Sequence, residues 1–125
     1  MIKILIKTSD GRFNKFFKHS EFACNCTNVD CTRTLYNEEL INILFIIRRN
    51  CKFPLDISSG YRCQKHNSAN NGVNHSYHLV GMAADIRTDL LDDEQISILL
   101  KHIRIYSDYY YVGNGFIHLD KRNLL

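Results

Sequence analysis

The sequence predicts a single-domain α+β fold in which helices flank a small antiparallel sheet. The 125 residues suffice for one hydrophobic core but not for two ordinary domains, so we treat residues 1–125 as one unit. Helical and strand patterns follow one another irregularly, without the strict alternation of a doubly wound parallel sheet. The composition, 45% hydrophobic and 23% charged with one proline, is typical of a folded protein rather than a disordered one.

The first third of the chain predicts one strand and one long helix. Residues 1–7 alternate like a strand, residues 20–22 indicate a short helical turn, and residues 24–33 form a polar loop that carries cysteines. Asn37 is a suitable N-cap, and the two glutamates that follow it suit the positive end of a helix dipole. This helix ends at Asn50, and its apolar stripe contains Leu40, Ile43, Leu44 and Ile47.

The middle of the chain predicts two short strands. They cover residues 54–58 and 82–86, and the second is small and apolar enough for a buried position. Between them lie a tight corner at residues 59–61 and a long loop at residues 67–75, which is rich in Asn, Ser and Gly.

The last third predicts a second helix and a hairpin. Asp92 and Gln95 have the spacing of a capping box, and the apolar stripe after them contains Ile96, Leu99, Leu100 and Ile103. A Gly-Asn-Gly turn then joins strands at residues 109–112 and 116–120, because its glycines tolerate the positive φ that hairpin turns need.

Charge and hydropathy argue against several classes of function. No apolar run approaches the roughly 20 residues of a membrane-spanning helix, so we expect no membrane insertion. The first residues lack the apolar core and cleavage site of a signal peptide, so we expect synthesis in a cytoplasm. The net charge of +3 is spread along the chain, and its densest basic patch, Arg48, Arg49 and Lys52, is interpreted as solvated surface. We therefore expect no nucleic-acid partner.

Two segments carry side chains that suit a metal site. His78 precedes Asp85, which lies in a stretch of small apolar residues where a buried carboxylate needs a partner. Gly81 permits a sharp reversal between them. In the last strand, alternation puts His118 and Asp120 on one face and the apolar residues on the other. Two nitrogens and one carboxylate oxygen, with a fourth position left for water, form the ligand set of a catalytic zinc centre.

These residues belong to three ordered motifs. Ser-x-His-x-x-Gly-x-Ala-x-Asp spans residues 76–85, Ser-Gly-Tyr-Arg-Cys precedes it at residues 59–63, and Phe-Ile-His-Leu-Asp follows at residues 116–120. Together they resemble the zinc D-alanyl-D-alanine carboxypeptidases of the peptidase M15 family, over about residues 16–122. The size is most similar to that of the small phage-encoded members, which act on host peptidoglycan. The resemblance implies an α+β zinc fold shared with the Hedgehog signalling domain and the vancomycin-resistance dipeptidases.

The resemblance also implies an activity and a set of site residues. The chain would be a zinc metallopeptidase that cleaves peptidoglycan stem peptides, either as a D-Ala-D-Ala carboxypeptidase or as an endolysin. His78, Asp85 and His118 would be the zinc ligands. Arg62 would face the scissile carbonyl and stabilise the developing oxyanion, and a salt bridge that fixes the corner is its alternative role. The run Tyr109–Tyr111 mainly packs the hairpin, with one hydroxyl as a further candidate for holding substrate.

The general base is where the sequence departs from the family pattern. Many relatives carry glutamate three residues before the last histidine ligand, but here that position is Gly115. We predict that Asp120 takes this role, because it shares a face with the histidine. Its alternative role is that of a structural partner to Arg122 or to a tyrosine. The weaker candidates are His75 and Asp108.

The cysteines allow several interpretations. Five cysteines without an export signal argue against a disulfide framework in the compartment of synthesis. Cys24, Cys26 and Cys31 have the spacing C-x-C-x4-C, which is not the C-x2-C of common zinc knuckles. A second, structural zinc there would need a fourth ligand from Cys63, Cys51 or a histidine. We expect instead buried thiols, or a disulfide formed after release from the cell.

Three functions are consistent with these features. The first is a peptidase whose partner is the peptidoglycan stem peptide, and we expect it to act on the cell wall as a monomer. The second is a non-catalytic zinc module that binds peptidoglycan or a protein, which the glycine at position 115 makes credible. The third is a nucleic-acid-binding zinc domain built on the cysteines, but a net charge of +3 without a basic stripe offers little affinity for phosphate.

Overall fold

Helix α1 covers Glu38–Cys51 and begins as the sequence predicts. The computed structural model describes residues 2–7, 10–26, 31–69 and 76–124. In it, the side chain of Asn37 accepts a hydrogen bond from the backbone N–H of Glu39, which satisfies a free donor at the start of the helix. The helix runs one residue past the expected Asn50 and ends at Cys51, and the capping residue Lys52 has a left-handed φ of 64°.

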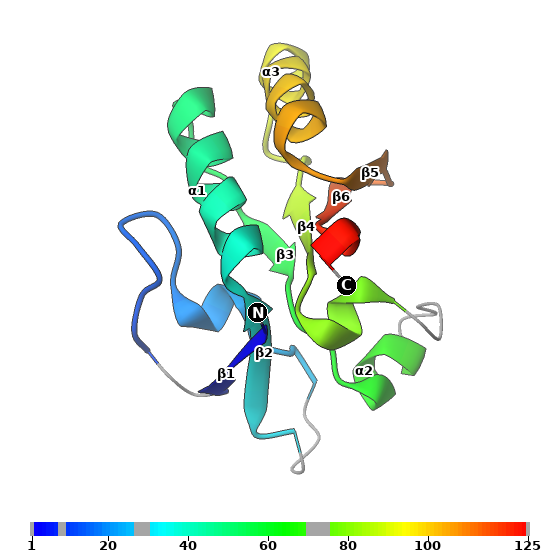
Figure 1. Ribbon diagram of the computed structural model, residues 1–125. Helices are drawn as coiled ribbons and strands as arrows, with labels where there is room; N and C mark the ends of the chain where they lie inside the picture. The colour runs from blue at the N-terminus through cyan, green and yellow to red at the C-terminus, as the bar shows by residue number, and fades with distance from the viewer. Residues whose placement is uncertain (1, 8–9, 27–30, 70–75, 125) are drawn as a thin grey trace.

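Helix α3 covers Asp93–Tyr106, and its capping box is confirmed. The carboxylate of Asp92 accepts from the backbone N–H of Gln95 at 2.8 Å, and the Gln95 side chain accepts from the backbone N–H of Asp92 at 3.0 Å. Leu99 and Ile103 from this helix and Leu44 from α1 are fully buried in one core with the inner face of a sheet. The α+β prediction is therefore confirmed (Figure 1).

That sheet is antiparallel, with strand order β3-β4-β6-β5. The β5–β6 hairpin has the predicted bounds, whereas β3 and β4 are shifted from the expected 54–58 and 82–86. The strands are β3 (Ile57–Ser59), β4 (Ala83–Arg87), β5 (Tyr109–Val112) and β6 (Phe116–Asp120). Alternation buries Ile117 and Leu119 in the core and turns His118 to the other face, as predicted.

A second, two-stranded sheet lies apart from the first. Strand β1 (Ile2–Ile6) is predicted by the sequence, but its antiparallel partner β2 (Arg33–Asn37) is not. The expected loop at residues 24–33 therefore ends in a strand whose last residue is also the N-cap of α1. The sequence does not predict β2, because this five-residue strand beside a polar loop is defined by its pairing with β1 rather than by an alternating hydrophobic pattern of its own.

Four short helical segments complete the described chain. Three are 3-10 helices, η1 (His19–Phe22), η2 (Tyr77–Val80) and η3 (Arg122–Leu124), and the fourth is α2 (Gln64–Ala69). The turn at residues 20–22 corresponds to η1, whereas α2 takes up the start of the expected loop at residues 67–75. The rest of that loop lies outside the described residues.

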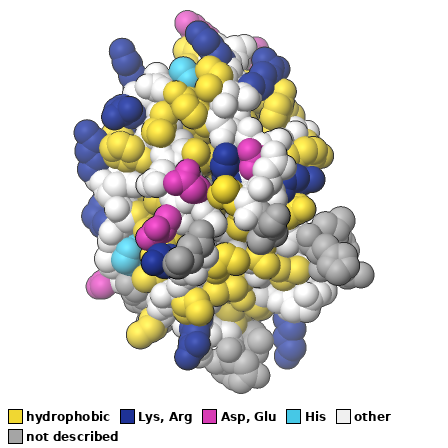
Figure 2. Space-filling view, viewed as in Figure 1, with side chains coloured by type: hydrophobic (Ala, Val, Ile, Leu, Met, Phe, Trp, Pro, Cys, Tyr) yellow, Lys and Arg dark blue, Asp and Glu magenta, His cyan; other side chains and the backbone are white. Residues whose placement is uncertain are grey.

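Two features of the described residues concern membrane insertion and nucleic-acid binding: the length of the helices and the distribution of charge on the surface. None of the described helices is long and apolar enough to cross a membrane. Figure 2 shows one face of the molecule, on which Lys and Arg side chains lie in several separate places with hydrophobic and acidic groups between them. This face thus lacks the continuous basic stripe that nucleic-acid binding favours.

Candidate metal centre

Three buried side chains from three elements converge on one point. Antiparallel pairing of β4 with β6 sets Asp85 directly opposite His118, and η2 brings His78 to the same place. The Oδ1 atom of Asp85 lies 3.1 Å from Nε2 of His78 and 3.0 Å from Nδ1 of His118. The two histidine nitrogens are 3.3 Å apart. The structure therefore brings together the three residues that the sequence analysis expects as zinc ligands.

His78 is held by contacts on both sides of its short helix. Ser76 caps η2, because its side chain accepts from the backbone N–H of His78. Gly81 ends η2 with a φ of 72°, and a side chain there would collide with the backbone of Leu35. The carbonyl of Gly60, 2.7 Å from Nδ1 of His78, can only accept, so Nδ1 carries the hydrogen. In the neutral ring, the lone pair of Nε2 then points at Asp85.

His118 is oriented by the opposite ring nitrogen. Its Nε2 lies 2.9 Å from Oδ2 of Asp120, which leaves Nδ1 facing Asp85. Burial would lower the pKa of His118, but hydrogen bonds to Asp120 and Asp85 raise it. A histidine whose outer nitrogen donates to a carboxylate and whose inner nitrogen faces a second ligand is typical of metal sites.

Asp120 is completely buried, and both of its oxygens are engaged. Oδ1 accepts from the backbone N–H and from Nε of Arg122, and Oδ2 accepts from Nη2 of Arg122 as well as from His118. Burial alone would raise the pKa of Asp120, yet the hydrogen bonds from Arg122 and His118 lower it to about 2. Its role as general base stays a prediction, and its contacts are those of the alternative role, a partner of Arg122.

Arg62 contacts the centre by a hydrogen bond to Asp85. Its Nη2 donates to Oδ2 of Asp85 at 3.0 Å, the oxygen that faces away from the two histidines. Its Nε donates to the hydroxyl of Ser59, and Nη1 lies 3.5 Å from Oδ1 of the buried Asn67. Burial would raise the pKa of Asp85, but hydrogen bonds from His118 and His78 outweigh it and hold the pKa well below its usual range. Asp85 is thus a carboxylate at neutral pH.

Two members of the tyrosine run, Tyr109 and Tyr111, lie against the ring of His118, and the closer of the two is Tyr111. Tyr111 lies opposite His118 in the β5–β6 pairing, and its ring stacks on that histidine with centroids 4.8 Å apart. Burial and the charge of Asp85 raise the pKa of Tyr111, so its hydroxyl remains a hydrogen-bond donor at neutral pH. Sequence reasoning could not choose among the three tyrosines without the hairpin register.

The remaining candidates for the general base differ in placement. Asp108 binds Lys121 at 3.2 Å and the backbone N–H of Asn123 at 3.0 Å. His75 lies outside the described residues. Gly115 has a φ of 82°, a conformation that disfavours any residue with a side chain, so the hairpin turn itself disfavours glutamate at this position.

The donor set fits a zinc ion. Tetrahedral zinc with bonds of about 2.0–2.2 Å to nitrogen and oxygen sets neighbouring ligand atoms about 3.3–3.6 Å apart. The three candidate ligand atoms are 3.0–3.3 Å apart, so they need to spread only slightly to accept the ion. With three protein ligands, one position stays open, which is typical of catalytic rather than structural zinc.

Comparison with known protein families identifies this chain's family. A sequence model described as peptidase M15 matches residues 15–120, which include Arg62, the three candidate ligands and Asp120. None of the curated proteins and none of the solved structures that were compared matches the chain.

Proposed function

The chain belongs to the peptidase M15 family, and from this premise we propose that it is a zinc-dependent peptidase that hydrolyses a bond in the stem peptides of bacterial peptidoglycan. The observation that carries the proposal is the buried centre of His78, Asp85 and His118. Both histidines have their outer nitrogens fixed by acceptors, and both inner nitrogens face the same carboxylate oxygen. Histidines that bind a metal through one ring nitrogen commonly bind an acceptor with the other, and both histidines here have that arrangement.

Each residue around the centre has a distinct role in this proposal. When bound, zinc polarises a carbonyl oxygen and lowers the pKa of a water molecule toward about 7. The guanidinium of Arg62, held by Ser59 and Asn67, supplies a fixed positive charge beside the centre for the oxygen of the scissile carbonyl. The hydroxyl of Tyr111, whose ring stacks on His118, supplies a neutral donor for the same oxygen or for the substrate backbone.

Asp120 acts through His118 rather than on the substrate. Its Oδ2 accepts the hydrogen of Nε2, so it keeps the ring in the tautomer that directs Nδ1 at the centre. Arg122 holds the carboxylate in place with three further hydrogen bonds. We therefore treat Asp120 as a positioning residue, and its contribution as general base is tested below.

The decisive experiment is digestion of purified peptidoglycan, with the soluble and insoluble products analysed by mass spectrometry. We expect the zinc-loaded protein to release stem-peptide fragments, to lose this activity on chelation and to regain it when zinc is added. Loss of a terminal D-Ala would identify a carboxypeptidase, and opened cross-links or freed stems would identify an endolysin-type enzyme. Unchanged peptidoglycan after exposure to the zinc-loaded protein would overturn the proposal.

A non-catalytic zinc module is the second candidate, and the conformation of Gly115 favours it. The positive φ of Gly115 disfavours the glutamate that many relatives carry at this position. The carboxylate of Asp120 is already hydrogen-bonded to Arg122. Such a module would sediment with insoluble peptidoglycan in a zinc-dependent manner and release no fragments. The same digestion experiment therefore separates the two candidates.

We expect Arg62→Lys to lower turnover while the zinc content stays unchanged. Lysine keeps the charge, but one ammonium group cannot bind Ser59, Asn67 and Asp85 together as the planar guanidinium does. Removing one donor to a developing oxyanion costs up to about 10²–10³-fold in rate. Initial rates of muropeptide hydrolysis and metal analysis on the same preparation measure both quantities.

Arg87→Lys is the matched control for this variant. Arg87 lies on the same strand as Asp85, but its side chain is exposed and pairs with Asp89. We expect this control to hydrolyse muropeptides at the wild-type rate. A wild-type rate for Arg62→Lys as well would assign Arg62 the alternative role of fixing the corner.

A further inference from the structure

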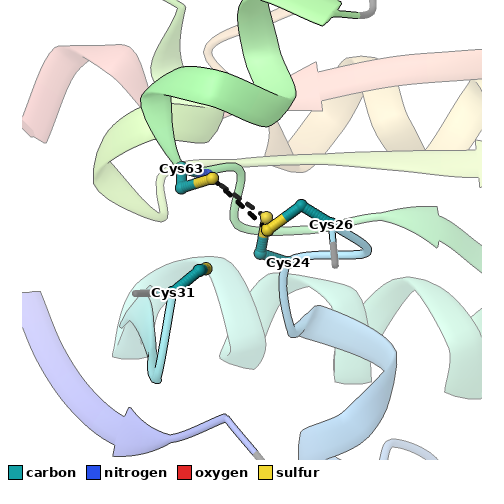
Figure 3. Close-up of side chains that lie close together, drawn as sticks. All are labelled: Cys24, Cys26, Cys31 and Cys63. Atoms are coloured by element: carbon teal, nitrogen blue, oxygen red, sulfur yellow. Dashed lines mark hydrogen bonds between the residues drawn. The ribbon is translucent and has the colours of Figure 1, made fainter. Parts of the chain in front are cut away.

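Four of the five cysteines meet at a second site, which is separate from the histidine centre. Cys24, Cys26 and Cys31 come from the segment between η1 and β2, and Cys63 comes from the turn before α2 (Figure 3). All four sulfur atoms lie within 4.8 Å of one another. Sequence spacing alone left the fourth member open between Cys63, Cys51 and a histidine, and the fold selects Cys63.

The separation of the sulfur atoms suits a metal better than a disulfide. A tetrahedral zinc ion with bonds of about 2.3 Å to sulfur sets neighbouring sulfur atoms about 3.8 Å apart. The Cys26 and Cys63 sulfur atoms are 3.5 Å apart, far beyond the roughly 2.05 Å of a disulfide bond. A disulfide would also involve only two of the four sulfur atoms, whereas the structure gathers all four.

The surroundings of the sulfur atoms suit thiolates. The backbone N–H of Cys63 points at the sulfur of Cys24 at 3.3 Å, and the backbone N–H of His66 points at the sulfur of Cys63 at 3.4 Å. The ammonium of Lys7 lies 3.6 Å from the sulfur of Cys26 and 2.8 Å from its carbonyl oxygen. Donors of this kind stabilise negative sulfur, and a nearby cation offsets part of the charge that four thiolates bring to a divalent ion.

The partial exposure of the cluster argues against a purely apolar role for its cysteines. Three of the four cysteines are only partly buried, so they do not serve mainly as apolar core residues. Cys51 differs, because it is buried in the core at the end of α1, outside the cluster.

We propose that Cys24, Cys26, Cys31 and Cys63 bind one structural zinc ion that ties the segment after η1 to the turn that carries Arg62. Four thiolates close the coordination shell, so the ion has no open position for a reaction. Soft thiolate ligands favour zinc over magnesium or calcium. Cys63 directly follows Arg62, whose backbone N–H binds the carbonyl of His78, so the ion fixes the backbone next to the histidine centre.

Metal analysis of the protein purified under reducing conditions tests this site. We expect two zinc ions per chain in the wild type and one in each of Cys31→Ala and Cys63→Ala. Cys51→Ala is the matched control and should keep both ions, because Cys51 is not part of the cluster. With cobalt in place of zinc, the wild type should show thiolate-to-cobalt charge-transfer absorption, which both cluster variants should lose.

A second measurement needs no variant. Alkylation of the native wild type, followed by intact mass analysis, should modify the four clustered thiols only after a chelator has removed the ion. One zinc ion per chain with no thiolate-to-cobalt absorption would overturn the proposal, as would equal alkylation with and without chelator. A disulfide within the cluster of the reduced preparation would also overturn it. None of these results depends on peptidase activity, so the test stands apart from that of the proposed function.

Discussion

Replacing His78 or His118 by alanine should lower the zinc content by one ion per chain and reduce peptidoglycan hydrolysis to the uncatalysed background. Each substitution removes one of three candidate ligand atoms that lie 3.0–3.3 Å apart. The remaining pair leaves at least two positions of a tetrahedral ion to water, which weakens binding sharply. Metal analysis and mass spectrometry of digested peptidoglycan measure the two effects on one preparation.

His102→Ala is the matched control, because His102 lies on α3, outside the group of candidate ligands. It should keep the wild-type zinc content and activity. Circular dichroism and thermal unfolding would show whether a ligand variant has lost its fold as well as its metal. Retention of the wild-type zinc content and affinity by both ligand variants would show that the ion is bound elsewhere.

Chelation should also destabilise the wild-type fold. The three ligand atoms come from η2, β4 and β6, so an unfolded chain cannot present them together. Free zinc at about 100 times its dissociation constant adds about 2.7 kcal/mol to the free energy of unfolding. A thermal scan with and without chelator should therefore show a lower unfolding temperature without metal, and the shift should be smaller in His118→Ala.

The sequence predicts elements whose signals are local. Asn37 caps α1, Asp92 and Gln95 cap α3, and the Gly-Asn-Gly turn joins β5 to β6. Each of these signals acts over a few neighbouring residues, so it can be recognised without knowledge of the tertiary structure. The helix α2 was missed for the opposite reason, since its six residues are mostly polar and present no apolar stripe.

The site could be predicted only in part. The sequence shows which side chains share one face of a strand, but tertiary contacts determine where each side chain points on that face. Strand alternation correctly puts His118 and Asp120 on one face of β6. It does not tell on which side of the histidine ring the carboxylate lies. The guanidinium of Arg122, two residues further on, forms two hydrogen bonds with that carboxylate and holds it at Nε2, away from Asp85.

Asp120→Asn should weaken zinc binding by about 10–100-fold, while turnover at saturating zinc stays within about tenfold of the wild type. An asparagine offers one oxygen and one amide group, but the present carboxylate accepts hydrogen bonds on both oxygens. Either His118 or Arg122 must therefore face an N–H donor and lose its partner. Competition with a chromophoric chelator measures the zinc affinity, and muropeptide hydrolysis at several zinc concentrations measures turnover.

Asp108→Asn separates this effect from a general loss of stability. Asp108 is a partly buried carboxylate beside the same hairpin, and it too binds a cation, Lys121, and a backbone N–H. Because it does not contact a histidine of the centre, its substitution should lower thermal stability without changing zinc affinity.

A different result for Asp120→Asn would contradict the prediction: full zinc affinity together with a loss of about 10²–10⁴-fold in turnover, the usual effect of removing a positioned base. The carboxylate would then have to leave Arg122 during the reaction to act as the general base, since in the structure both of its oxygens are occupied.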